Sequence, residues 1–164
     1  MTQPIFGRDK VLKFRQLKNA DKENAAKLAL QIEHTISYDM NADSQQTKDG
    51  PINYSGGLTT TIDITAISTR DAINQMLRES VLQQEILEVW EIDLGAEPKA
   101  GKYPAKYGRG ILATWEDPAN VEEASQFSTT FNVDGYLQDG YVAVSEEELA
   151  EIQYTFRGTE KVEE

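Results

Sequence analysis

The residues that could act as nucleophiles, bases or metal ligands are few in this 164-residue chain. The chain has one histidine, His34, and no cysteine. Cysteine nucleophiles, thiolate metal sites and disulfide bonds are therefore excluded, and no second imidazole is present to share a metal ion with His34. Because His34 lies among alternating apolar residues, we expect a hydrogen-bonded core residue rather than a base or a ligand.

Carboxylates are abundant, but their spacing does not indicate a site. Asp39, Asp43 and Asp49 lack the one-three-five spacing of a calcium-binding loop. The glycines do not form a phosphate-binding loop, and no serine lies in a nucleophile elbow. We therefore predict a protein that is not an enzyme and that has no catalytic residue, no metal site and no cofactor.

Two other functions remain open at this point. The first is a hydrolase with two carboxylates, and its candidates rest on charge alone: Glu88 with Glu91 or Asp93. The second is a carbohydrate-binding or adhesin β-sandwich module. It would use a stacking surface formed by aromatic residues of one predicted strand, Tyr103, Tyr107 and Trp115. Core packing is the simpler interpretation of these aromatic residues.

The elements that position these residues are mostly strands. Apolar and polar residues alternate with a period of two in seven segments, which are 10–17, 28–38, 58–67, 86–93, 103–115, 126–133 and 141–144. Tight turns are predicted at Asp134–Gly135 and at Asp139–Gly140. Gly108 and Gly110 predict a bulge or a close backbone approach.

Two helices are predicted beside the strands. Ile73, Met76, Leu77 and Val81 form the apolar stripe of an amphipathic helix of about four turns that lies on a sheet. A capping box at Ser145 begins a short C-terminal helix. The fold class is therefore mainly β, a β-sandwich or partly open β-barrel with one flanking amphipathic α-helix and a short C-terminal helix.

The length allows one domain, which we place at residues 1–157, followed by a disordered tail at 158–164. We expect a soluble intracellular chain without a signal sequence or membrane segment. The net charge is −12, with a balance of +4 over residues 1–20 and −11 over residues 116–164. Such an acidic chain should repel nucleic acid. The asymmetry indicates either a solvated surface or complementary patches between neighbouring copies, with Arg8, Lys10, Lys13 and Arg15 on the basic side.

A polar segment, residues 39–57, connects two predicted strands and is much longer than a hairpin needs. We expect either a mobile surface loop or an arm that becomes ordered on a neighbouring copy. In the second case, Asp43, Lys48 and Asp49 are candidate contacts, and Gly50 and Pro51 reverse the chain direction. Deleting residues 42–47 is then expected to leave a folded protomer that no longer assembles.

Several stretches together resemble a family of phage proteins. They are "QPIFGRDKVLKFR", "EHTIS", "ADSQQTKDG" followed by "GGL", "EVWEID", "KYPAKYGRGILATWE" and "VDGYLQDGY". They are similar to the major tail proteins, or tail tube proteins, of long-tailed siphophages that infect Gram-positive bacteria, of the lactococcal-phage type. The likeness runs nearly end to end, and none of its motifs is catalytic.

The resemblance implies a virion protein, made in the bacterial cytoplasm, whose six-membered rings stack into a hollow tail through which DNA is ejected. Its implied partners are itself, the tail completion and baseplate-side tail proteins, and a tape measure protein inside the tube, while DNA passes without specific binding. An acidic wall suits such a lumen because it repels phosphates. We expect the polar faces of 31–37 and 59–65 to be lumen candidates, with Glu33 and Asp63 as the lumen charges.

Overall fold

The computed structural model describes residues 4–144. This part of the chain contains one α-helix, α1 (Ala72–Gln83), and two single-turn 3-10 helices, η1 (Gly7–Asp9) and η2 (Leu17–Asn19). Its eight strands are β1 (Lys10–Gln16), β2 (Ala26–Lys27), β3 (Gln31–Thr47), β4 (Gly50–Ile67), β5 (Leu87–Asp93), β6 (Lys102–Glu116), β7 (Gln126–Val133) and β8 (Gln138–Ala143). The predicted mainly β class is confirmed. None of the helices in residues 4–144 is long and apolar enough to cross a membrane.

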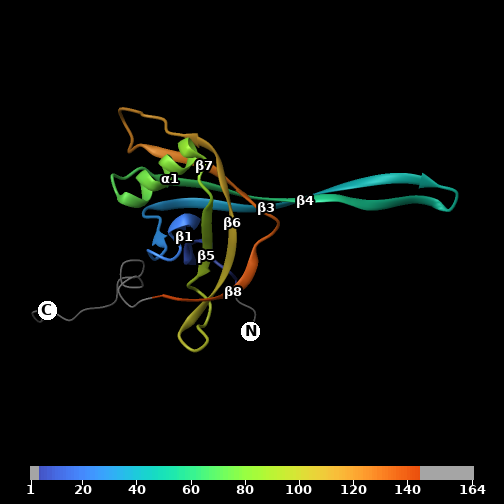
Figure 1. The fold of residues 1–164 in the computed structure, drawn as a ribbon, viewed down its shortest axis with the longest axis horizontal. Coiled ribbons are helices and arrows are strands. Elements are labelled where there is room, and N and C mark those ends of the chain that lie inside the picture. Colours follow the sequence, from blue (N-terminus) through green and yellow to red (C-terminus); the bar gives the residue numbers. More distant parts are fainter. Residues whose placement is uncertain (1–3, 145–164) are drawn as a thin grey trace, which may run out of the picture.

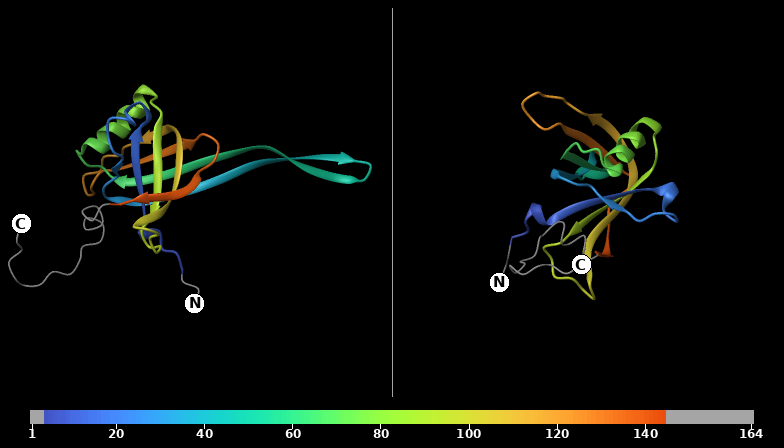
Figure 2. Two further views of the ribbon diagram at one scale, coloured as in Figure 1. Left: turned by 60° about the horizontal axis from the view of Figure 1, so that its bottom comes forward. Right: turned by 90° about the vertical axis from the view of Figure 1, so that its left-hand side faces the viewer.

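All eight strands belong to one antiparallel sheet with the order β2-β1-β5-β6-β7-β4-β3, and β8 pairs with β6. The sheet curls so that β3, at one end, approaches β1 near the other end (Figure 2). The Gln31 side chain joins these ends: its Oε1 accepts from the Leu12 N–H and its Nε2 donates to the Leu12 carbonyl, both at 3.1 Å. The fold is therefore a partly open barrel whose seam is bridged by a side chain.

The core lies inside this curled sheet, where alternate residues of each strand meet. Its largest buried side chains include Phe14, Ile62, Ile64, Phe127 and Phe131, each at most 2% exposed. Helix α1 lies across one end of the barrel (Figure 2) and contributes Ile73 and Leu77 to the same cluster. The amphipathic helix and the inward positions of the strand at 58–67 are as predicted, except for Leu58, which is exposed.

Two hydrogen bonds between Thr69 and Asn74 stabilise the start of α1. Asn74 Nδ2 donates to Thr69 Oγ1 at 3.0 Å, and the Thr69 N–H donates to Asn74 Oδ1 at 3.5 Å. Asp71 is the N-cap residue by position, but its side chain makes no capping hydrogen bond. The helix ends at Gln83, and its C-cap residue Gln84 adopts a left-handed conformation with φ 55°.

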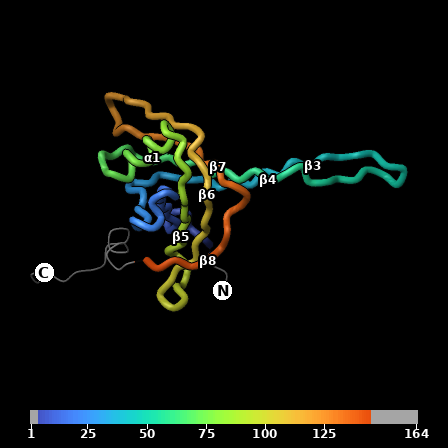
Figure 3. The backbone as a smooth tube through the Cα atoms, in the orientation of Figure 1, coloured from blue at the N-terminus to red at the C-terminus, as the bar shows by residue number. Residues whose placement is uncertain are grey.

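The expectation of a long polar loop at 39–57 is wrong. β3 and β4 remain paired as far as Thr47 and Gly50, so that only Lys48 and Asp49 lie between the strands. The result is a straight two-stranded ribbon that projects far beyond the barrel (Figures 1 and 3), which we call the arm and define as residues 39–58. Every residue of the arm is exposed except Gly50, which is half-buried. Strand pairing here satisfies the backbone without any burial of side chains.

Two irregularities determine which residues face the core along β3 and β4. Near the base, Gln31 pairs with Ala66 but Glu33 pairs with Thr65, so Ile32 is an extra residue in β3. Leu30 and Ile32, expected on the buried face, are 58% and 49% exposed as a result. Gln31, expected on the polar face, turns inward to the seam.

The second irregularity lies at the base of the arm. Met40 pairs with Leu58 and Ala42 pairs with Ser55, so Gly56 and Gly57 together lie opposite one residue of β3. Gly57 has φ +125°, and a Cβ on Gly56 would lie 3.0 Å from the Asn41 carbonyl oxygen. The glycine pair is therefore a β-bulge that only residues without a side chain accommodate easily.

A third bulge, between Leu112 and Thr114, reverses which alternate residues of β6 face the core. Tyr107 therefore faces outward while Trp115 faces the core, and the expected common face from Tyr103 to Trp115 does not exist. The predicted close backbone approach is present, because a Cβ on Gly110 would lie 1.8 Å from the Asn132 carbonyl oxygen.

Of the two predicted Asp-Gly turns, one is present and the other is not. The turn at Gly135 is present, with φ +75°, but Asp139 and Gly140 lie within β8 rather than in a second turn. The predicted C-terminal helix at Ser145 and the predicted tail at 158–164 lie outside the described residues.

Candidate assembly surfaces

The first candidate surface is the polar outer face of β3, β4 and β7. Its side chains alternate with the core residues of the same strands and are Glu33, Thr35, Ser37, Thr61, Asp63, Thr65, Ser128, Thr130 and Asn132. Glu33 pairs with Thr65, and Thr35 pairs with Asp63, so the two carboxylates lie on the same face and on adjacent strands. Both are exposed, and Asp63 Oδ1 accepts a hydrogen bond from Thr130 Oγ1 at 2.9 Å. None of the nine side chains is basic.

The second candidate surface is the arm. At its tip Thr47 Oγ1 donates to the Gly50 carbonyl at 2.6 Å and accepts from the Asp49 N–H at 3.3 Å. Lys48 and Asp49 form the turn, and Gly50 follows it with φ +112°. Pro51 does not take part in the reversal, because it pairs with Gln46 inside the ribbon.

Asp43 lies farther from the tip, opposite Tyr54. The arm also exposes four large apolar side chains, each at least 45% accessible: Met40, Ile52, Tyr54 and Leu58. The arm is therefore not uniformly polar, and it combines carboxylates with apolar groups that no part of residues 4–144 covers.

The predicted basic segment does not form one surface. Arg8 and Lys10 line a cavity, whereas Lys13 and Arg15 lie on the opposite face of β1 because strand side chains alternate. Arg15 is already engaged within the chain: its Nε donates to Glu88 Oε1 at 3.0 Å, and its guanidinium lies 5.1 Å from the centre of the Trp90 ring. Of the four residues, Arg8 and Lys10 retain access to a partner.

Glu88 belongs to a small cluster on the outer face of β1, β5 and β6. Besides Arg15, it accepts a hydrogen bond from the Tyr107 hydroxyl, which in turn accepts from Arg109 Nε at 2.9 Å. Burial raises the pKa of Tyr107, and the hydrogen bond to Glu88 raises it further. Glu91 lies on the other face of β5, so the geometry does not support a hydrolase that pairs Glu88 with Glu91.

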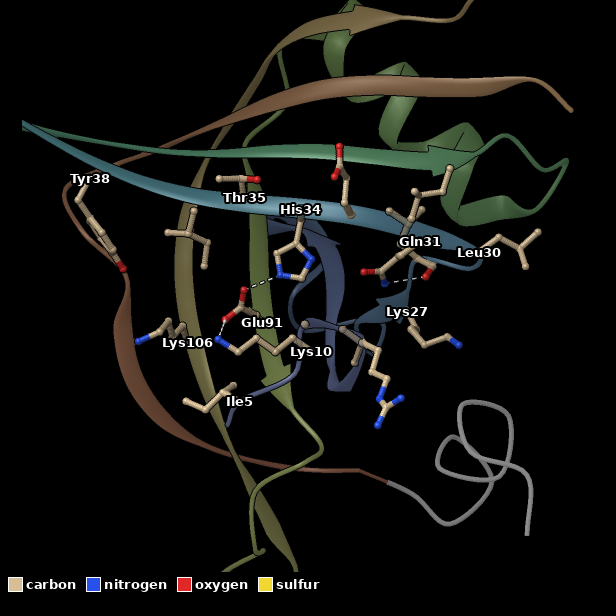
Figure 4. Close-up of a pocket in the computed structure, with 17 residues that line it drawn as sticks. Ile5, Lys10, Lys27, Leu30, Gln31, His34, Thr35, Tyr38, Glu91 and Lys106 are labelled. Atoms are coloured by element: carbon tan, nitrogen blue, oxygen red, sulfur yellow. Dashed lines mark hydrogen bonds and ion pairs between the residues drawn. The ribbon is translucent and has the colours of Figure 1, made fainter. Parts of the chain in front are cut away.

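The third candidate surface is a cavity of about 960 Å³ at the open seam of the barrel (Figure 4). At its floor His34 Nε2 lies 2.5 Å from Glu91 Oε2, and Lys10 Nζ lies 3.7 Å from Glu91 Oε1. Burial alone would raise the pKa of Glu91, but the hydrogen bond and charge of His34, with Lys10 and Lys106, lower it. The prediction of a hydrogen-bonded His34 is confirmed. The sequence did not indicate that Glu91 is the partner of His34, because the two residues are 57 positions apart.

The aromatic residues proposed for a sugar platform are not brought together. Trp115 stacks on Phe127 inside the barrel, with ring centres 4.5 Å apart and planes at 7°. Tyr107 packs against Trp90 on the outer face. Within residues 4–144 no group of three or more potential ligands is placed to hold a metal ion.

A family model described as phage tail tube protein matches residues 4–139. The chain belongs to the phage tail tube protein family. The resemblance found in the sequence is thereby confirmed, and the protein is a structural component of the virion, a subunit of the phage tail tube.

Two curated relatives are similar to this tail tube protein. The putative tail protein of Staphylococcus phage phiMR25 is 26% identical over 162 residues, covering 94% of this chain and 83% of the relative. The tail tube protein gp17.1* of Bacillus phage SPP1 is 24% identical over 150 residues. That match covers 91% of this chain but 56% of the relative, so this chain spans little more than half of the SPP1 protein.

Solved structures show the same fold. The SPP1 tail tube subunit superposes with a TM-score of 0.73 at 21% identity, covering 98% of this chain and 91% of that chain. A subunit from the tail of a gene transfer agent particle, determined with C6 symmetry, gives a TM-score of 0.63 at 13% identity over 84% of this chain and 98% of that chain.

Proposed function

We propose that this tail tube protein forms six-membered rings that stack into a hollow tube through which phage DNA passes. The observation that carries the proposal is the arm. A two-stranded ribbon is marginally stable on its own in water, and the arm packs neither face on its own barrel. Its Met40, Ile52 and Tyr54 are each more than half exposed. An ordered arm therefore indicates a function in contact with another subunit.

The length of the arm and the kind of contact it makes are consistent with stacked rings. At about 3.3 Å per residue, the arm extends roughly 30 Å beyond the base of the hairpin, far enough to reach a copy in the next ring. Contacts between different patches of identical subunits give closed rings or open stacks. The sixfold symmetry of the gene transfer agent tail supports rings of six.

The lumen is assigned to the polar outer face of β3, β4 and β7. Hydroxyl and amide side chains with two carboxylates, and no basic residue, give a surface that repels phosphates and offers no fixed cationic contact. DNA then passes without specific binding. The tape measure protein inside the tube and the tail completion and baseplate-side proteins at its ends are the other proposed partners. No catalytic activity is proposed.

Electron microscopy of the concentrated, purified protein tests the assembly. We expect rings and tubes from the wild-type chain. A deletion of residues 42–47 alone would leave their β4 partners unpaired, so the arm must be shortened on both strands. Removing Ser44 and Gln45 together with their partners Asn53 and Ile52 keeps the turn and the register and shortens the arm by about 7 Å.

We expect this shortened variant to unfold at the wild-type temperature but to form rings without tubes. Normal tubes from it would mean that the arm is an ordinary surface hairpin.

A second experiment tests the lumen. Glu33→Lys with Asp63→Lys is expected to leave tubes intact and to slow DNA ejection from phage that carry the change. Unchanged ejection, with both residues on the outer wall in a cryo-EM map, would contradict the lumen assignment.

A further inference from the structure

We infer that the cavity at the barrel seam is the socket for the distal arm, residues 43–54, of a second copy of this chain. The inference rests on the proposed stacking and adds to it a specific partner surface for the arm. It follows from three properties of the cavity: its position, its charge and its apolar rim.

The cavity lies where the sheet fails to close. Its walls come from β1 and β2 at one end of the sheet and from β3 at the other, with Glu91 and Lys106 between them (Figure 4). Every residue from 30 to 36 lines it, on both alternating sides of β3. The cavity therefore reaches the free edge of β3 and not only one of its faces. A free strand edge has unpaired N–H and C=O groups that an added strand can satisfy.

The charge of the cavity favours an acidic occupant. Arg8, Lys10, Lys27 and Lys106 line it, against the carboxylate of Glu91; Glu33 also borders the cavity, but its side chain lies on the outer face of β3. Lys10 is near Glu91, and Lys106 binds Asp139 at 3.0 Å. Within residues 4–144, neither Arg8 nor Lys27 has an acidic partner; the Arg8 guanidinium only lies over the Phe6 ring at 4.8 Å. Two cations therefore remain available to an incoming carboxylate.

The apolar rim favours an occupant that also carries hydrophobic side chains. Ile5, Leu30, Ile32 and Tyr38 surround the opening, and each is at least 49% exposed. Leu30 adopts φ 52° and Ile32 is the extra residue of the bulge in β3, so the backbone itself directs both outward. The exposure of these four residues is otherwise unexplained by the isolated barrel.

The arm matches these three properties. It consists of strands, it carries Asp43 and Asp49 against Lys48 beyond the bulge, and it exposes Ile52 and Tyr54. The arm of the same protomer projects away from the barrel (Figure 1), whereas the cavity is lined by residues 30–36 at the opposite end of β3, so the arm cannot turn back into its own socket. The occupant must come from a second copy, which makes the contact heterologous and open-ended, as a growing stack requires.

Charge exchange tests the pairing. We expect Arg8→Glu with Lys27→Glu to abolish tubes, and Asp43→Lys with Asp49→Lys to do the same, each without loss of thermal stability. Combining all four substitutions in one chain is expected to restore tubes. Glu79→Lys, on the exposed face of α1, is the matched control and should assemble normally. Failure of the four-fold variant to assemble better than either pair would contradict the socket.

Cross-linking tests the location directly, because the natural chain has no cysteine. Tubes of a variant with Asp49→Cys and Lys27→Cys, treated with a short bismaleimide, should yield a ladder of covalent oligomers. Asp49→Cys with Gln83→Cys on the exposed end of α1 should yield none. Tubes without a ladder, or a ladder from the Gln83 variant alone, would overturn the socket while leaving the proposed stacking intact.

A ladder from Lys27→Cys with Glu148→Cys, and none with Asp49→Cys, would also overturn the inference and assign the cavity to the C-terminal segment. If the wild-type chain forms no tubes at all, the proposed function fails first and the socket fails with it. The two failures are therefore distinguishable by microscopy of the unmodified protein.

Discussion

The base and the arm of the β3–β4 hairpin share one continuous ladder of backbone hydrogen bonds but differ in what surrounds it. At the base, β4 buries Thr60, Ile62, Ile64 and Ala66 and pairs with β7 on its other edge. In the arm the same two strands pair only with each other, and nearly every side chain is exposed. Backbone pairing alone thus forms the strands. The core of the protomer stabilises them at the base, and under the proposed stacking a neighbouring copy stabilises them in the arm.

The largest expected difference in unfolding free energy is between truncations of two isoleucines of β4, one at the base and one in the arm. Ile62→Ala should lower the free energy of unfolding by about 2–5 kcal/mol, because Ile62 is fully buried and its loss leaves a cavity. Ile52→Ala, at a position 53% exposed, should change it by less than about 0.5 kcal/mol. Urea denaturation of the unassembled protein measures both. Similar losses for the two variants would mean that the arm folds as part of the core.

Removal of a carboxylate is expected to give a second, smaller difference in stability between the barrel and the arm. Because the pKa of Glu91 is lowered below its usual 4.5, the folded chain gains stability that is complete above that value and lost as pH falls through the lowered pKa. Glu91→Gln should therefore cost about 1–3 kcal/mol at pH 7, and the cost should shrink in acid.

Asp43→Asn in the arm is the matched control, with an expected change below about 0.5 kcal/mol at either pH. Unfolding measured at pH 7 and at pH values below 4.5 checks both variants. A pH-independent cost for Glu91→Gln would contradict the charge pairing with His34 and Lys10.

The smallest effect concerns the tip of the arm. Arm amides should exchange with solvent by local opening, well before those of the base. Thr47→Ala removes the hydroxyl that bonds the Gly50 carbonyl and the Asp49 N–H. It should speed exchange in the arm about 2- to 10-fold, as expected for one net hydrogen bond, with no change in global stability. Hydrogen exchange followed by mass spectrometry separates the arm from the base, and equal protection of the two would remove the contrast.

The base of β4 was predictable from sequence and the arm was not, for a physical reason. Alternation of apolar and polar residues reports burial, so it identified β4 from Thr60 to Ile67 and the apolar stripe of α1. The arm buries nothing, so its strands leave no such pattern. The Asp49–Gly50 pair is a hairpin signal that could have identified the turn, but its flanking residues lack the alternation that normally accompanies it.

The candidate surfaces were predictable to different degrees. Glu33 and Asp63 share a face because strand periodicity and the pairing of neighbouring strands require it. The division of Arg8, Lys10, Lys13 and Arg15 between two faces follows from the same period of two. The cavity could not be predicted, because it depends on contacts between residues far apart in the chain, such as His34 with Glu91, and on the bulge at Ile32.

The glycine pair in β4 determines where the arm can gain or lose a residue. Gly56 and Gly57 together face Asn41, so the loss of one glycine codon would leave the pairing of Ala42 with Ser55, and of every residue beyond, unchanged. A single-codon loss between Gly50 and Ser55 would instead leave one residue of β3 without a partner. The bulge is therefore a position at which the loss of one codon would change the twist of the arm while the pairing of residues at its tip stays the same.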